Sequence, residues 1–300
     1  MSRLAFCGTP ALAVPALRAL VEAGHEVTLV VSRPDTRRGR GAHTTPSPVK
    51  QAALALGLDV SDDLEQVTSA GAELGVVVAY GRIVPARILD LVPMINVHFS
   101  LLPRWRGAAP LERAILAGDA RTGVCIMRME AGLDTGPVLA RAELALDDLP
   151  LSDVQARLAD VGARLVVETL EHGVAGVLAA GEPQQGEVVY AAKLEPEELR
   201  IDWKATADEV ARLVRLERAW TTCGGRRLRV LQGRVVADDD GKAFSEGPGT
   251  LRGTTVRCGA GALELVRVQP EGRRPMSASD WRRGAAVPDG TVLGDPQAHR

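Results

Sequence analysis

Two short apolar runs flank an amphipathic stretch at the start of the chain, and this pattern most limits the folds open to it. Residues 4–7 and 26–32 are apolar enough to be buried strands. Residues 11–23 between them carry apolar side chains at helical spacing, and Gly24 ends that stretch. A strand, a helix and a second strand in this order predict an α/β fold, in which helices cover a parallel sheet.

The same kinds of pattern continue to about residue 180. Strands are expected at 74–80, 95–98, 123–129 and 138–146, and helices at about 48–57 and 153–170. The stretch 33–50 is rich in glycine, proline and arginine and has no period, which is typical of a long exposed loop. We therefore expect a first domain over 1–180.

Beyond residue 180 the composition changes. Residues 181–206 are polar and irregular, which is typical of a linker. A helix at 207–216 is followed by short strands between glycine turns, at 227–231, 254–258 and 262–269. Strands at this spacing predict a small β-barrel or sandwich, so 207–300 is expected to form a second domain.

Some classes of protein are disfavoured by what the sequence lacks. No apolar run approaches the ~20 residues of a membrane span, and no signal peptide is recognisable, so a cytoplasmic location is expected. The four cysteines form no C-x-x-C pair, so no metal site is expected. Cys7 and Cys125 lie in apolar runs and should be buried thiols. Gly8 opens the first turn, but the absence of G-x-G-x-x-G gives dinucleotide binding no support.

Charge is divided unevenly along the chain, although the net charge is only −2. Residues 204–300 contain 17 Lys and Arg against 12 Asp and Glu, whereas residues 1–203 contain 19 against 26. A basic second part is a hint of a polyanionic partner. An incidental bias explains the same numbers equally well.

One stretch concentrates side chains that can carry chemistry, N-V-H-F-S-L-L-P-R-W-R-G-A-A-P over 96–110. Asn96 and His98 lie two apart at a strand end, so they share one face. Ligands of open α/β sheets bind at the carboxyl ends of the strands. Asp134 follows the next strand in the loop E-A-G-L-D-T-G, which we expect at the same edge of the sheet. The sequence thus predicts a cluster of Asn96, His98 and Asp134.

Such a cluster suits the transfer of an acyl group to an amine. Asn96 could donate a hydrogen bond to the developing oxyanion, which is worth ~3 kcal/mol. His98 could take the proton that the nitrogen loses, a roughly 10²–10⁴-fold effect, and Asp134 could orient His98 or favour its cation. No serine or cysteine is paired with this histidine by position, which favours direct transfer. The residues alone leave a purely structural role for all three open.

These motifs resemble those of the folate-dependent formyltransferase family. The resemblance is carried by N-x-H, then S-L-L-P-x-x-R-G, then G-L-D-T-G. It extends to F-C-G-T-P at 6–10, P-S-P-V-K at 46–50, V-V-A-Y-G at 77–81, K-L-x-x-E-E-x-R-I-D-W at 193–203 and Q-P-E-G-R-R-P-M-S-A at 269–278. It implies a Rossmann-like formyltransferase domain with a parallel-rich sheet, and a C-terminal OB-like β-barrel domain.

The resemblance also implies a reaction. The formyl donor is then 10-formyltetrahydrofolate, a co-substrate used without a metal, and the catalytic residues are Asn96, His98 and Asp134. The S-L-L-P segment is implied to lie against the folate, through Ser100, Leu101, Leu102 and Pro103.

Two features depart from the family pattern. Phe99 stands where a small residue is usual, and we expect its ring to face the core behind the strand. The stretch L-E-R-A-W at 216–220 lacks a proline-rich run that many members have between their domains.

Members of the family formylate different amines, and the second domain with its arginines favours initiator methionyl-tRNA over the others. The expected tRNA contacts are Arg37, Arg38, Arg40, Arg226, Arg227, Arg273 and Arg274. No obligate protein partner is implied, and a monomer is expected. The main alternative is a formyltransferase acting on a nucleotide-linked amino sugar. A non-catalytic RNA-binding protein and a formyl-folate hydrolase are further alternatives.

Overall fold

The computed structural model describes residues 1–37, 44–236 and 247–294, and the contacts of the chain divide it into two compact units. The first unit consists of 1–111, 121–145 and 154–192. The second consists of 112–120, 146–153 and everything from 193 onwards. Residues 181–192, the first part of the predicted linker, thus belong to the first unit.

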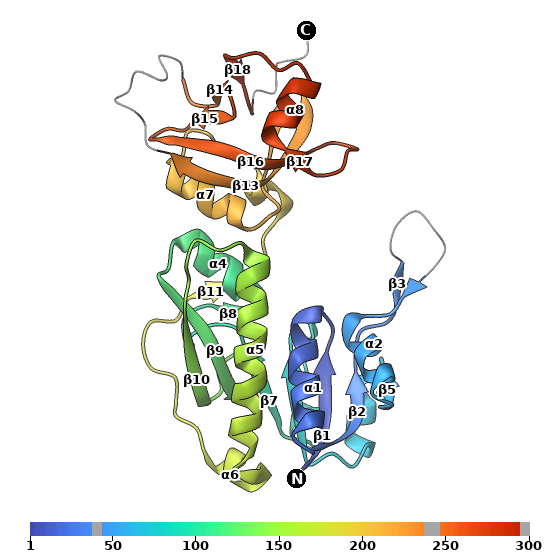
Figure 1. The fold of residues 1–300 in the computed structure, drawn as a ribbon. Coiled ribbons are helices and arrows are strands. Elements are labelled where there is room, and N and C mark those ends of the chain that lie inside the picture. The colour runs from blue at the N-terminus through green and yellow to red at the C-terminus, as the bar shows by residue number, and fades with distance from the viewer. Residues whose placement is uncertain (38–43, 237–246, 295–300) are drawn as a thin grey trace. The chain divides into compact units, whose positions relative to one another are not determined.

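A mostly parallel sheet forms the centre of the first unit (Figure 1). Its order is β10-β9-β7-β6-β1-β2-β5. The strands are β1 (Arg3–Gly8), β2 (Glu26–Val31), β5 (Val60–Ser61), β6 (Leu74–Val78), β7 (Met94–His98), β9 (Arg121–Arg128) and β10 (Val138–Ala145). The five strands from β7 to β5 are parallel, while β9 and β10 each run antiparallel to their neighbour. The predicted parallel-rich α/β domain is confirmed.

Helices connect and cover these strands. They are α1 (Val14–Glu22), α2 (Pro48–Ala55), α3 (Ala86–Leu89), α5 (Leu151–Leu170) and α6 (Gly173–Ala179), with 3-10 turns at Ala11–Ala13 and Leu64–Ser69. The helix α4 (Pro110–Ala117), which precedes β9, belongs mostly to the second unit. Figure 1 shows α1 and α5 on the same side of the sheet. The start of α2 follows from its sequence, because the Ser47 hydroxyl accepts from the Lys50 amide and Pro48 suits the first turn.

The segment after α6 returns to the sheet and lies along the loop that follows β7. Glu182 forms a bridge with Val138, and β11 (Tyr190–Ala191) pairs in parallel with β8 (Arg106–Gly107). A β carbon on Gly107 would lie 2.8 Å from the Ala191 oxygen, and its φ of 121° is one that side chains rarely adopt. Gly107 therefore allows the two segments to approach this closely.

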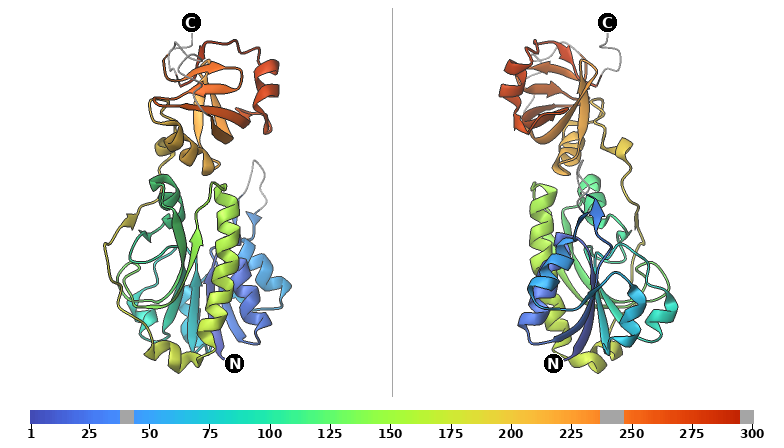
Figure 2. Two further views of the ribbon diagram at one scale, coloured as in Figure 1. Left: turned by 60° about the vertical axis from the view of Figure 1, so that its left-hand side comes forward. Right: turned by 90° about the vertical axis from the view of Figure 1, so that its right-hand side faces the viewer.

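The second unit is an antiparallel barrel of short strands (Figure 2). Its order is β12-β13-β16-β15-β14-β18, and β17 pairs with β16. The elements are a 3-10 turn at Pro196–Leu199, α7 (Ala207–Arg215), β12 (Trp220–Cys223), β13 (Arg226–Val236), β14 (Thr250–Arg252), β15 (Thr255–Arg257), β16 (Ala262–Pro270), β17 (Met276–Ser277), α8 (Ala278–Gly284) and β18 (Thr291–Val292). Trp203, Leu228 and Trp281 belong to its core. The predicted C-terminal β-barrel is confirmed.

The described part of the chain contains no helix long and apolar enough to cross a membrane. Within the same residues, no group of three or more His, Cys, Asp or Glu side chains could hold a metal ion. Cys7 and Cys125 are fully buried and free, as their sequence context predicts.

Candidate active site

Strand β7 carries two polar side chains on one face of the sheet. Val97 between them faces α5, since its Cγ1 would lie 3.0 Å from a β carbon on Gly162. Successive side chains of a strand point to opposite faces, so Asn96 and His98 lie on the face away from α5. Asn96 is half-buried, and within the described residues its amide has no hydrogen-bond partner. That amide is thus available to a ligand.

The chain around His98 holds its imidazole in one tautomer. The side chain is only 5% exposed, and Nε2 lies 2.9 Å from the backbone oxygen of Trp105. A carbonyl oxygen can only accept a hydrogen bond, so Nε2 carries the proton and donates it. The lone pair of the neutral ring is then on Nδ1, and Nδ1 is the atom that can take up a further proton.

Asp134 reaches His98 by a route different from the one expected. The strand before it, β9, runs antiparallel to β7, with Arg128 opposite Ile95. The expectation that the Asp134 loop leaves the sheet at the edge where β7 ends is therefore wrong. The loop folds back toward that end instead, and Oδ2 of Asp134 lies 3.7 Å from Nδ1 of His98. The two predicted side chains do come together.

The Asp134 carboxylate is held in place by the backbone of the loop that follows β7. The backbone N–H of Gly107 donates to Oδ2 at 2.8 Å, and the side chain is only 12% exposed. Asp134 itself has a φ of 51°, in the left-handed region. Gly136 is required nearby, because a β carbon there would lie 1.9 Å from the Arg128 oxygen.

The S-L-L-P segment is mostly turned into the protein. Ser100 is fully buried, and its hydroxyl donates to the Arg104 oxygen at 2.7 Å. Leu102 packs with Cys125, Met127 and Val138, and Pro103 is also buried. Leu101 is half-buried. These side chains shape the loop between His98 and Trp105, and their contact with folate stays a prediction.

Phe99 faces the interior behind the strand, as its sequence position predicts. The ring is 7% exposed, and its Cε1 would lie 3.6 Å from a β carbon on Gly162 of α5. The bulky residue beside His98 therefore packs against α5 and leaves the face of Asn96 and His98 clear.

Four residues at the site were not identified from the sequence. Trp105 acts through its backbone oxygen and Gly107 through its backbone N–H, and side-chain chemistry signals neither role. The Arg106 guanidinium donates to Oε1 of Gln184. The Gln184 amide donates to the backbone oxygens of Asp134 and Gly136. Gln184 lies in the stretch that resembled a linker, where nothing in the sequence pattern points to the site.

Two of the predicted arginine pairs lie at the same end of the barrel. Arg226 and Arg227 begin β13, and Arg273 and Arg274 follow β16, all with exposed side chains. The two segments are neighbours, because the Glu271 amide donates to the Arg227 oxygen at 3.0 Å. In the first unit, Arg37 ends the short strand β3 (Thr36–Arg37), which pairs with β4 (Thr44–Thr45). Arg38 and Arg40 lie outside the described residues.

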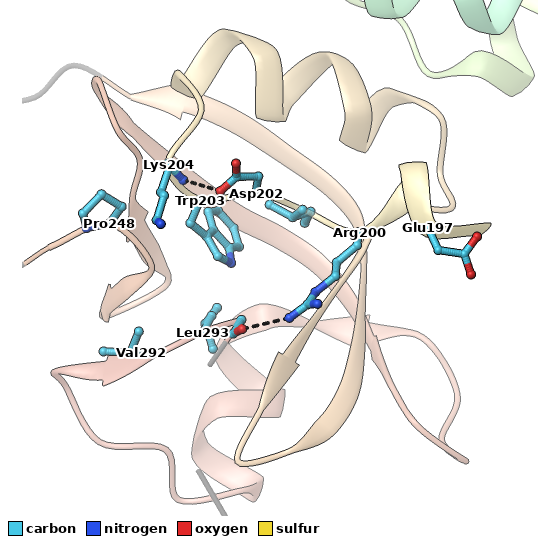
Figure 3. Close-up of a pocket in the computed structure, with 10 residues that line it drawn as sticks. Glu197, Arg200, Asp202, Trp203, Lys204, Pro248, Val292 and Leu293 are labelled. Carbon is cyan, nitrogen blue, oxygen red and sulfur yellow. Dashed lines mark hydrogen bonds between the residues drawn. The ribbon is translucent and has the colours of Figure 1, made fainter. Parts of the chain in front are cut away.

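The second unit also contains a pocket of about 480 Å³ (Figure 3). Its lining includes Arg200, which donates to the Gly294 oxygen, and Asp202, which accepts from the Lys204 amide. Both signs of charge lie around it, and its lining includes none of the predicted site residues.

The first unit brings together side chains that suit proton-coupled chemistry. It combines an amide that no described residue engages, a histidine whose Nδ1 accepts no hydrogen bond from the described residues, and a carboxylate beside that nitrogen. In the residues described, neither Cys7 nor Cys125 can serve as a nucleophile there, because burial raises the pKa of both thiols. This composition suits acyl transfer to a nucleophile supplied by the substrate.

Comparison with known families agrees with this class of chemistry. The family model described as formyl transferase matches residues 2–170, and the model described as formyl transferase, C-terminal domain, matches residues 193–286. The chain therefore belongs to the formyl transferase family.

Relatives that cover nearly the whole chain place it more narrowly among the methionyl-tRNA formyltransferases. The enzyme of that name from Roseobacter denitrificans is 46% identical over 97% of this chain and 98% of its own length. The one from Jannaschia sp. is 45% identical over 97% and 99%.

Solved structures show the same fold at low sequence identity. HypX from Aquifex aeolicus, in complex with tetrahydrofolic acid, aligns with a TM-score of 0.66 at 19% identity, over 94% of this chain and 47% of that one. The methionyl-tRNA formyltransferase from Clostridium thermocellum aligns with a TM-score of 0.56 at 14% identity, over 79% and 94%.

Proposed function

We propose that this enzyme transfers the formyl group of 10-formyltetrahydrofolate to the amino group of initiator methionyl-tRNA. The observation that carries the proposal is the placement of Asn96, His98 and Asp134 in a chain 46% identical to a methionyl-tRNA formyltransferase. The amine attacks the formyl carbon directly, through a tetrahedral intermediate. The bond from that carbon to the folate nitrogen then breaks, and the folate nitrogen leaves as a neutral amine after taking up a proton in place of the one that the attacking amine has lost.

Asn96 stabilises the negative charge that develops on the formyl oxygen. Its amide is half-buried and has no partner in the described part of the chain, so no existing hydrogen bond must break when the oxyanion forms. A fixed donor of this kind is worth about 3 kcal/mol in the transition state.

His98 takes the proton that the attacking nitrogen loses. Because Nε2 is engaged with the Trp105 oxygen, Nδ1 is the atom that accepts this proton. Asp134 then stabilises the imidazolium, since its Oδ2 lies 3.7 Å from Nδ1 and is held by the Gly107 amide. A positioned base of this kind contributes roughly 10²–10⁴-fold to the rate.

The residues of the site fit a formylated folate. A formyl oxygen needs a donor, which the Asn96 amide provides, and the flat rings of the folate need apolar surface. Leu133, the neighbour of Asp134, exposes 58% of its surface. The segment 101–103 is the further surface that we assign to the folate, through its backbone and the half-buried side chain of Leu101.

The barrel supplies affinity for the tRNA backbone. Arg226, Arg227, Arg273 and Arg274 gather at one end of β13 and β16 with exposed side chains. Arginine contacts to phosphates give affinity that does not depend on sequence and falls with salt. Arg37, Arg38 and Arg40 complete the proposed set.

The test is a comparison of acceptors with labelled 10-formyltetrahydrofolate as the donor. We expect labelled product with charged initiator methionyl-tRNA and none with uncharged tRNA, which lacks the amine. A nucleotide-linked amino sugar, offered at the same concentration, should not be formylated. Formylation of the sugar alone would overturn the proposed acceptor, and release of formate without an acceptor would overturn the proposed transfer.

A further inference from the structure

The side chain of Gln184 joins three segments of the active site. Its Nε2 donates to the backbone oxygens of Asp134 and Gly136, both at 2.8 Å. Its Oε1 accepts from Nε and Nη2 of Arg106, at 3.1 and 2.7 Å. The amide therefore uses both of its N–H groups and its oxygen, and no part of it is left without a partner.

The Asp134 loop needs such support, because its backbone is not in a relaxed conformation. Asp134 has a φ of 51°, in the left-handed region that non-glycine residues adopt uncommonly. Residues in such conformations persist only when their surroundings hold them. The two carbonyl groups that Gln184 binds lie at Asp134 and two residues later, so the amide spans the strained position.

The same network holds both the side chain and the backbone of Asp134. The Gly107 N–H donates to the Asp134 carboxylate at 2.8 Å. Arg106, the residue before Gly107, donates to the Gln184 side chain, whose amide N–H in turn donates to the Asp134 backbone oxygen. Arg106 and Gly107 form β8, which is itself paired with β11 a few residues after Gln184. Hydrogen bonds to its side chain and to its backbone thus both restrain Asp134, whose carboxylate faces His98.

We infer that Gln184 is a positioning residue of the catalytic site, which fixes the Asp134 carboxylate against His98 by holding the backbone of the Asp134 loop. This inference rests on the proposed function, in which Asp134 stabilises the protonated His98. Gln184 touches neither folate nor tRNA in this role and acts only through Asp134. Displacements of about 1 Å at a reacting group can cost roughly 10²-fold in rate.

An amide is required at this position, and the isosteric acid cannot replace it. Gln184→Glu keeps the size of the side chain and gives the Arg106 guanidinium a carboxylate. The second carboxylate oxygen would then face the Asp134 and Gly136 carbonyl oxygens with no N–H between them. The glutamate variant therefore separates the link to the loop from the link to Arg106.

The experiment is steady-state kinetics with 10-formyltetrahydrofolate and charged initiator methionyl-tRNA. We expect Gln184→Ala and Gln184→Glu each to lower kcat by roughly 10–100-fold, with both KM values within about threefold of wild type. The matched control is Gln185→Ala, since Gln185 is exposed and makes no side-chain hydrogen bond in the described part of the chain. This control should retain wild-type kcat, and all three variants should keep the wild-type melting temperature.

Unchanged kcat in Gln184→Ala would overturn the inference, as would a loss confined to KM or a loss matched by a lower melting temperature. Wild-type kcat in Gln184→Glu would show that the link to the two carbonyls is not needed, and would also overturn it. Asp134→Asn in the same assay separates this inference from the proposed function. A fully active Asp134→Asn refutes the proposed role of Asp134, whereas an inactive one beside a fully active Gln184→Ala refutes only the role of Gln184.

Discussion

Nδ1 of His98 and Oδ2 of Asp134 face each other at 3.7 Å, which is too long for a direct hydrogen bond but short enough for a strong electrostatic interaction. Because Nε2 donates to the Trp105 oxygen, the neutral ring presents a lone pair to the carboxylate. A proton that arrives on Nδ1 would turn this contact into an ion pair between an imidazolium and a carboxylate in a largely buried setting, which is the role proposed for Asp134.

Asp134→Asn tests the electrostatic part of this arrangement. The amide keeps the size of the side chain and can still accept from Gly107, but it carries no charge to stabilise the imidazolium. We expect kcat to fall by roughly 10²–10⁴-fold, with KM for the folate nearly unchanged. Initial rates over a range of donor concentrations measure both, and an unchanged kcat would remove the carboxylate from the mechanism.

Gly107→Ala tests the close approach of β8 and β11. Its φ of 121° is strained for alanine, and the new methyl group would lie 2.8 Å from the Ala191 oxygen. We expect the free energy of unfolding to drop by about 1–3 kcal/mol and kcat to drop as well, because the N–H that holds Asp134 must shift. Urea unfolding and initial rates provide the two readouts. Gly253→Ala serves as control, because its φ is also positive, at 57°, while no atom lies within 4 Å of its β carbon, so its cost should be clearly smaller.

Phe99→Ala tests whether the ring faces α5 or the substrate. The ring is buried against Gly162, so its removal leaves a cavity and should lower the free energy of unfolding by about 3–5 kcal/mol. Below the unfolding temperature, KM for the folate should remain close to wild type. A strong rise in that KM without loss of stability would place the ring in the folate site instead.

Thiol labelling tests the packing of the two cores. Burial raises the pKa of Cys7 to about 12 and of Cys258 to about 11, and it also raises the pKa of Cys125. At pH 8 these thiols are almost entirely protonated and covered, so they should not react while the protein is folded. Cys223 is only half-buried, and it should be the single slow site. Cys223→Ser should abolish labelling of the native protein, and denaturant should expose the three remaining thiols.

Salt dependence tests the arginines of the barrel. Arg273→Ala combined with Arg274→Ala should weaken tRNA binding and reduce the slope of log affinity against log salt, by up to roughly 0.7–0.9 for each phosphate that the variant no longer binds. KM for the folate should not change. Arg141→Ala is the matched control, since Arg141 is an exposed arginine of β10 outside the proposed set. A slope that stays the same in the double variant contradicts the proposed role of this arginine pair.

Much of the fold follows from local patterns. The apolar runs at 4–7 and 26–32 became β1 and β2, and the predicted helix over 153–170 became α5. Asn96 and His98 share a face because strand geometry requires it. These features depend on the spacing of side chains, which the sequence displays directly.

The rest depends on relations that spacing does not encode. Periodicity indicates a strand at 123–129 but not its direction. Because β9 runs antiparallel to β7, the Asp134 loop leaves the sheet at the edge opposite to the one expected. Gln184 meets Asp134 across 50 positions of sequence, through an amide in an irregular stretch. Trp105 and Gly107 contribute backbone atoms, which every residue has, so only the folded chain reveals their roles.

Single-turnover formyl transfer by wild type and His98→Ala tests the central claim most directly. Enzyme in excess is mixed with labelled 10-formyltetrahydrofolate and charged initiator methionyl-tRNA, and the formylated product is followed with time. We expect rapid product with wild type and a rate lower by roughly 10²–10⁴-fold with His98→Ala, while both proteins bind folate and unfold at similar temperatures. A wild-type rate in the folded His98→Ala variant would contradict that claim.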